Sequence, residues 1–252
     1  MTSFPSFDPS DFAAYSPKHQ RDREANAWRL RVRRKLGELG KAAKAHLKKE
    51  CGLNLSCRTN LNHPYKFNFG RVQAQWAYLS RSPKDKKALV ERVGPAIGED
   101  VDTHYIQTTF VLSVDREGFE IALRIHPQAW WDSQNLKNRV LSATAEMDDW
   151  TETLNEIGEG YVLSLHNWKK EYPCGDLYPD QIENFFSFFE PGNHSLSIRH
   201  RIPAKLAVGL GPELGPLALE GLSKLAPAYQ FLTWTEENNW LFDAEGKVRH
   251  GS

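Results

Sequence analysis

The chain has 252 residues, of which 25% are charged, 40% hydrophobic and 12% aromatic, and its 32 Lys and Arg balance its 32 Asp and Glu. These proportions are ordinary for a globular protein and exclude collagen, low-complexity disorder and a disulfide-dense mini-scaffold. No apolar run approaches the roughly 20 residues that a membrane helix needs, and Met1 to Tyr15 lacks the pattern of a secretory signal. We therefore expect one domain over residues 1–252 and no membrane partner.

The first fifty residues predict an aromatic arm followed by a long basic helix. The arm, FPSFDPSDFAAY, would lie on the body of the protein, with Ser10 or Asp11 capping a short turn. From about residue 19 to 50, apolar residues recur at spacings of three and four, which is typical of an amphipathic helix: Ala25, Trp28, Val32, Leu36, Leu39, Ala43 and Leu47. Gly37 and Gly40 predict a kink or a split in this helix, and Gly52 predicts its end.

Alternating strands and helices follow. Strands are expected over 53–61 and 71–79, then a helix that Ser82 caps and Pro83 opens, then a hairpin of 104–114 and 119–126. The remaining elements are expected as helices over 127–140 and 145–157, a strand over 161–168, a loop over 169–180, a helix over 180–189, a strand over 196–202, one or two helices over 212–234 and a short strand over 240–242. This order predicts an α+β fold with a largely antiparallel sheet, helices packed on one face and a polar opposite face.

The polar face follows from the alternation of side chains along each strand. In strand 71–79, Val72, Trp76 and Tyr78 fall in the apolar set that should meet the helices. The polar set contains Asn54, Arg58, Asn60, Arg71, Gln73, Gln75, Tyr105, Gln107, Thr109, Glu120, Arg124, His126, Ser164, His166, Arg199 and Arg201. A solvated face explains such a set, and recognition of phosphate or bases by planar Arg, Gln and Asn groups is the alternative.

Charge is unevenly distributed along the chain. Residues 1–100 hold 20 Lys and Arg against 10 Asp and Glu (+10), and residues 101–252 hold 12 against 22 (−10). Such asymmetry favours a polyanion partner for the basic half, although attraction between the halves or simple solvation would also explain it. The candidate nucleic-acid-binding residues are Arg29, Arg33, Arg34, Lys41, Lys44, Lys48, Arg58 and Arg71.

A second candidate site surrounds the segment HPQAWWDSQNLKNR. Trp, Asp, Asn and Arg side chains at a strand-to-helix corner would line a pocket, to which two strand-end histidines would add acid–base groups. Its candidate residues are Arg124, His126, Trp131, Asp132, Asn135, Arg139 and His166. The alternative is that the tryptophans pack in the core while the polar residues are exposed. Since no named catalytic motif is present, the sequence leaves open whether the protein is an enzyme.

No two of the three cysteines form a CxxC pair, which predicts no disulfide framework, no metal site and a reducing, cytoplasmic location.

The features that carry a resemblance to a known family are FPSFDPSDF, the long N-terminal helix, NHPYKFNFG in a loop, and a hairpin that leads into a helix. In these features the chain resembles a large bacterial family of conserved proteins of unknown function. The resemblance covers about residues 1–140. It implies an α+β fold, and it transfers no activity, cofactor or site residue.

Three functions compete on these observations. The first is a binding protein that engages nucleic acid, or another phosphate-rich ligand, through the basic helix and the polar sheet face, within a larger complex. The second is a non-catalytic assembly subunit whose oppositely charged halves meet a protein partner or a second copy. The third is an enzyme with the pocket described above. No cofactor is expected for any of them.

Overall fold

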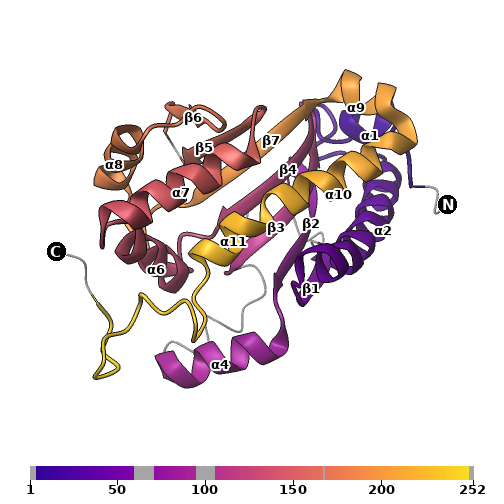
Figure 1. Ribbon diagram of the computed structural model, residues 1–252. Coiled ribbons are helices and arrows are strands. Elements are labelled where there is room, and N and C mark those ends of the chain that lie inside the picture. The colour runs from indigo at the N-terminus through magenta and orange to yellow at the C-terminus, as the bar shows by residue number, and fades with distance from the viewer. Residues whose placement is uncertain (1–3, 60–70, 95–105, 167, 250–252) are drawn as a thin grey trace. The chain divides into compact units, whose positions relative to one another are not determined.

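The computed structural model describes residues 4–59, 71–94, 106–166 and 168–249. Within them, seven strands form one antiparallel sheet in the order β1-β2-β3-β4-β7-β5-β6, which confirms the predicted α+β class (Figure 1). The strands are β1 Leu55–Thr59, β2 Ala74–Arg81, β3 Thr108–Asp115, β4 Gly118–Ile125, β5 Tyr161–Leu165, β6 Glu171–Pro173 and β7 Leu196–Pro203.

Most of the helices lie where the apolar periodicity predicts them. They are α1 Pro9–Ala13, α2 Asn26–Cys51, α4 Pro83–Val93, α6 Trp130–Val140, α7 Thr144–Ile157, α8 Pro179–Phe188, α9 Ala204–Leu210, α10 Leu214–Lys224 and α11 Ala226–Leu232. Strand β6 lies in the segment expected as a loop, and α9 begins before the expected helical region. Both are short elements, whose few residues give a weak periodic signal.

The chain divides into two compact units, each made of three segments. Unit 1 comprises Met1–Leu79, Phe110–Ala122 and His200–Ser223, and unit 2 comprises Ser80–Thr109, Leu123–Arg199 and Lys224–Ser252. Each unit therefore takes residues from both the basic and the acidic half of the sequence. The charge asymmetry persists, because unit 1 holds 18 Lys and Arg against 11 Asp and Glu (+7), and unit 2 holds 14 against 21 (−7).

Helix α2 runs unbroken from Asn26 to Cys51, so the predicted split does not occur. Its apolar stripe is fully buried at Val32, Leu36, Leu39, Ala43 and Leu47. The helix ends as predicted at Gly52, whose φ of 69° is a left-handed conformation that glycine adopts without a steric penalty.

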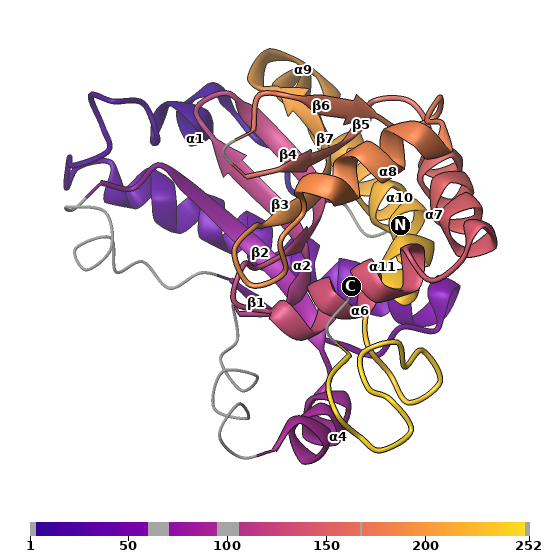
Figure 2. The same cartoon turned by 90° about the vertical axis from the view of Figure 1, so that its left-hand side faces the viewer.

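Gly40 sets the distance between α2 and the sheet. A Cβ atom at this position would lie 2.7 Å from Cys57 Sγ on β1 and 3.2 Å from Ala77 Cβ on β2, both closer than ordinary contact. Helix α2 therefore lies directly against these strands, and it runs beside β1 in both views (Figure 1 and Figure 2). The glycine that weakens the helix in isolation thus permits its tertiary packing.

The register of β2 against β3 corrects the predicted orientation of β2. Gln75 pairs with Val114 and Ala77 with Leu112, so Gln75, Ala77 and Leu79 face the helices. Trp76 pairs with Ser113 and Tyr78 with Val111, so the two aromatic residues lie on the opposite face. The prediction was wrong because it put the largest side chains against the helices, whereas the close approach at Gly40 leaves room only for a small residue, Ala77.

Unit 1 confirms that the opposite sheet face is polar. Arg201 on β7 contacts Asp115 at 2.5 Å and Glu120 at 3.4 Å. Burial lowers the pKa of the Arg201 guanidinium, but the two carboxylates more than offset this and hold it above its ordinary value. Glu120 is buried there beside Arg201, so the polar face is in part an internal ion-pair network.

Other local predictions are confirmed. Ser82 caps α4, since its hydroxyl accepts a hydrogen bond from Asp85 N, and Pro83 is the first helical residue. The hairpin forms between β3 and β4, while its predicted start at residues 104–105 lies outside the described residues. The expected strand at residues 240–242 is reduced to a single bridge between Phe242 and Val248.

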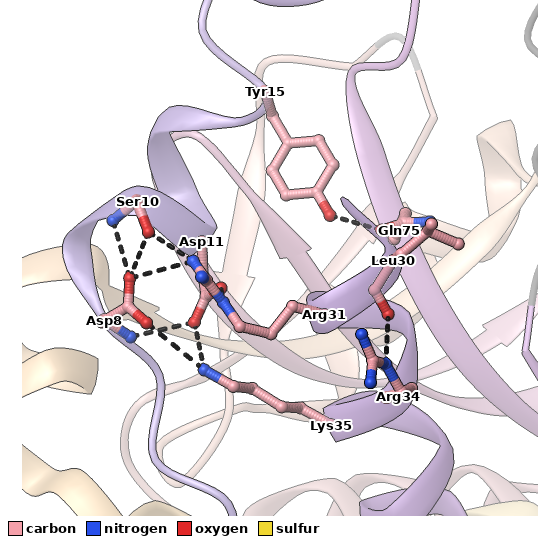
Figure 3. Close-up of polar contacts among 9 residues, drawn as sticks. All are labelled: Asp8, Ser10, Asp11, Tyr15, Leu30, Arg31, Arg34, Lys35 and Gln75. Atoms are coloured by element: carbon pink, nitrogen blue, oxygen red, sulfur yellow. Dashed lines mark hydrogen bonds and ion pairs between the residues drawn. The ribbon is translucent and has the colours of Figure 1, made fainter. Parts of the chain in front are cut away.

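The aromatic arm packs as predicted. Phe7, Phe12 and Tyr15 are buried, and Phe7 contacts the Phe119 ring at 5.6 Å between centroids. The turn in the arm is helix α1, but its N-cap is Asp8 and not Ser10 or Asp11 as predicted, because the Asp8 side chain accepts the hydrogen bond from Ser10 N. The Tyr15 hydroxyl donates a hydrogen bond of 2.6 Å to Gln75 Oε1, as Figure 3 shows.

Candidate nucleic-acid interface

The basic residues of α2 fall into two groups with different surroundings. Arg29 belongs to the first group, because it is buried and donates hydrogen bonds to the carbonyls of His19 and Asp22 and to Asn26 Oδ1. Its guanidinium therefore fastens the segment before α2 to the helix. Arg29 is one of the nucleic-acid contacts predicted from the sequence, but in the structure it is buried.

Arg31 and Lys35 are held by the arm. Arg31 Nε contacts Asp11 Oδ1 at 2.8 Å, and Lys35 Nζ contacts Asp11 Oδ2 at 2.5 Å, with Asp8 beside both cations (Figure 3). Asp11 is fully buried, so its charge is compensated by these two cations. For the Asp8 carboxyl, burial raises the pKa, but the hydrogen bond from Ser10 and the nearby Arg31 and Lys35 lower it below the ordinary value.

The second group is exposed and forms a stripe along α2. We define the basic stripe as Arg34, Lys41, Lys44 and Lys48, all exposed. Arg34, Lys41 and Lys48 are seven residues apart, and because two helical turns contain about 7.2 residues they return to nearly the same side. At about 1.5 Å per residue, the stripe is about 21 Å long. Within the described part of the chain, none of these four cations has a carboxylate partner.

The remaining candidate contacts lie near this stripe or beyond α2. Arg33 is half-buried on the same helix, Arg58 is exposed on β1, and Arg71 is exposed just before β2. Lys41 and Lys44 lie close to Cys57 on β1: burial raises the pKa of the Cys57 thiol, and the two ammonium groups offset part of that rise. The basic stripe therefore extends toward the strand that carries Arg58.

The second candidate site is a buried hydrogen-bond network and not an open pocket. Trp131, Asp132 and Asn135 are completely buried. Asp132 accepts hydrogen bonds from Arg81, from Thr108 Oγ1 at 2.6 Å and from Trp234 N at 2.9 Å. Burial lowers the pKa of the Arg81 guanidinium, but Asp132 and its other neighbours hold it above the ordinary value.

The polar residues of α6 bind the backbone of the C-terminal segment. Asn135 accepts from Trp240 N at 2.9 Å and donates to Leu232 O at 3.3 Å, and Asn138 donates to Trp240 O at 2.9 Å. Arg139 contacts Glu146, the Phe231 carbonyl and Asn238, and lies over the Phe231 ring. These side chains thus hold residues 231–240 against α6, a structural role that explains their spacing.

The two candidate histidines follow strands that are not adjacent in the sheet. His126 comes directly after β4 and His166 directly after β5, and β7 lies between these two strands. His126 is half-buried, which lowers its pKa, while His166 is exposed and Arg124 is half-buried. Among the described residues, no three His, Cys, Asp or Glu side chains come together as metal ligands.

A shallow groove in unit 1 has a volume of about 560 Å³ and lies against α1 and α9. Its lining is mainly apolar, with Arg116 and Lys205 as its charged side chains. Among the described residues that line it, none carries a carboxylate, a thiol or an imidazole. Among the described helices, none combines the length and the apolar character needed to cross a membrane.

No protein-family model matches the chain, and a comparison with curated proteins finds no match. The resemblance of residues 1–140 to a bacterial family stays a prediction, and its loop at residues 62–70 lies outside the described residues. Arg81 as the partner of Asp132, and the position of Trp76 and Tyr78 on the polar face, do not follow from the sequence pattern. No local pattern distinguishes Arg81 from the surface cations around it.

Proposed function

We propose that this protein is a cytoplasmic binding protein that engages nucleic acid through the basic stripe. The proposal is based on the difference between two groups of cations on α2. Arg29, Arg31 and Lys35 bind partners within the chain, whereas Arg34, Lys41, Lys44 and Lys48 form an exposed row on the positive unit. The free thiols of all three cysteines agree with a reducing compartment.

A comparison of magnitudes favours a polyanion over solvation alone. An exposed ion pair contributes only about 0–1 kcal/mol, so folding stability gains little from concentrating four cations on one face. Binding to a phosphate backbone releases condensed counterions, and the gain grows with every phosphate that is neutralised. A row about 21 Å long can contact several consecutive phosphates at once.

The test changes Arg34, Lys41, Lys44 and Lys48 together to Gln and measures binding to DNA and RNA by mobility shift and fluorescence anisotropy. The melting temperature should stay nearly unchanged, because these side chains are exposed. Affinity at about 50 mM salt should fall by at least tenfold, and the slope of log K against log salt should decrease by about 0.9 for each phosphate that the variant no longer neutralises.

The matched control changes Lys84, Lys87, Lys169 and Lys247 to Gln, which removes the same charge from exposed positions of unit 2. This control should bind almost as well as the wild type if the stripe, and not the net charge, carries affinity. Wild-type protein that shows no binding at about 50 mM salt would overturn the proposal. A molecular mass that rises with concentration and falls with salt would then favour the assembly subunit.

A further inference from the structure

Two aromatic side chains and an arginine lie together on the sheet face that points away from α2. Ala77 faces α2, so Trp76 and Tyr78, the alternate residues of β2, face the other way. Trp76 is 36% exposed, and Tyr78 is half-buried. Aromatic residues two positions apart on a strand present their rings side by side, which is the arrangement of a stacking platform for bases.

Arg58 links this pair to the basic stripe. Cys57 on β1 faces Gly40 of α2, so the next residue, Arg58, points to the same sheet face as Trp76 and Tyr78 on the neighbouring strand β2. In agreement, burial raises the pKa of the Tyr78 phenol and the Arg58 guanidinium offsets part of that rise. The preceding residue, Cys57, lies near Lys41 and Lys44. Because β1 is the edge strand of the sheet, positive charge continues around that edge from the stripe on α2 to the aromatic pair.

Resting on the nucleic-acid binding proposed above, we infer that the ligand is a single strand whose bases stack on Trp76 and Tyr78 while Arg58, Lys41 and Lys44 contact its phosphates. A duplex keeps its bases stacked inside and can use only the cations. Unstacked bases offer a ring face that any aromatic side chain accepts, which makes stacking tolerant of sequence. The surface therefore favours single-stranded DNA or RNA over duplex.

The experiment compares Trp76→Leu, which keeps an apolar side chain but removes the ring, with Trp76→Phe, which keeps a ring. Binding is measured on single strands of about 12 nucleotides, DNA and RNA, and on the matching duplex. Trp76→Leu should weaken single-strand binding by about tenfold without changing the salt slope, because the cations that meet the phosphates are all still present. Trp76→Phe should recover most of the affinity, and duplex binding should be the same for all three proteins.

Phe188→Ala is the matched control, since Phe188 is an exposed aromatic residue, 48% accessible, on α8 of unit 2, and it should bind as the wild type does. The wild-type affinities for single strands and for duplex can be compared without any substitution. This comparison still tests the inference if a variant does not fold. Equal wild-type affinity for single strands and duplex, both reduced by loss of the basic stripe, would overturn the inference and leave the proposed function intact. Absence of all nucleic-acid binding would overturn both.

Discussion

Single residues in this protein take their roles from partners that are distant in the sequence. Asp132 is held by Arg81, Thr108 and the backbone of Trp234, and Asn135 by two backbone groups of the C-terminal segment. The same residue types at a solvent-exposed corner would have been credible ligand contacts. Their complete burial makes them structural, because a buried polar group that loses its partner leaves the other group unsatisfied.

Asn135→Ala is therefore expected to destabilise the fold. The change leaves the Trp240 amide and the Leu232 carbonyl without their side-chain partner, which costs about 1–3 kcal/mol. Urea unfolding followed by circular dichroism measures the loss. Gln134→Ala on the same helix, at a half-buried position, should cost less than about 0.5 kcal/mol. Equal stabilities for Asn135→Ala and the wild type would contradict the structural role and favour a ligand site at this segment.

The cysteines should differ in reactivity. Burial raises the pKa of the Cys174 thiol to about 12, so almost no thiolate is present at pH 8, and the sulfur is also shielded from reagents. Native protein treated with iodoacetamide at pH 8 should be labelled at the partly exposed Cys51 and not at Cys174. Peptide mass spectrometry reports both sites. In urea all three cysteines should react, and rapid labelling of Cys174 in native protein would contradict its placement.

At the scale of elements, the contact of α2 with β1 and β2 depends on which helix positions lack a Cβ. Gly37 and Gly40 are both in the helix, but only Gly40 lies closer to the strands than a side chain permits. At Gly37 a Cβ would lie 3.7 Å from Thr59 Cγ2, an ordinary contact. At Gly37, helix propensity and packing therefore both permit alanine. At Gly40, helix propensity favours alanine but packing against the strands opposes it.

Gly37→Ala should stabilise the protein by about 0.5–1 kcal/mol, since alanine is the better helix former and meets no obstacle. Gly40→Ala should destabilise it by about 1–3 kcal/mol, because the added methyl overlaps Cys57 and pushes the helix from the sheet. Thermal and urea unfolding measure both. Cys57→Ala in the Gly40→Ala background should restore part of the loss, and stabilisation by both glycine substitutions would refute the packing argument.

For the whole molecule, electrical neutrality conceals a separation of charge between units. Unit 1 carries +7 and unit 2 carries −7, so the net charge predicts nothing about local attraction for anions. The exposed basic stripe belongs to the positive unit. Behaviour toward a charged surface should therefore follow the stripe and not the isoelectric point.

Chromatography on heparin tests this separation. At pH 8, above the sequence pI of about 7.1, the protein has a small net negative charge, yet it should bind heparin at low salt and elute as salt screens the contacts. The variant with Gln at the four stripe positions should pass through unbound, while the control with Gln at Lys84, Lys87, Lys169 and Lys247 should be retained. Wild-type protein in the flow-through would show that the stripe attracts no polyanion.

The sequence by itself determined the elements whose signals are local. The apolar spacing of α2, the Ser82–Pro83 start of α4 and the alternation on either side of the β3–β4 turn each depend on residues within a few positions of one another. Composition and strand order along the chain were enough to predict the α+β class. The candidate basic stripe was also evident, because exposed cations opposite an apolar face follow from helical geometry alone.

Only the tertiary structure decided which residues of each candidate set face solvent. The alternation of side chains along β2 defines two faces but does not show which of them meets α2. That depends on the contact of Gly40 with Cys57 and Ala77. Arg31 and Arg34 look alike in the sequence, yet Arg31 is set apart by its ion pair with Asp11, which lies 20 residues away. Asp132 likewise lies 51 residues from Arg81 and 102 from Trp234. Pairings over such separations depend on packing, which local patterns do not encode.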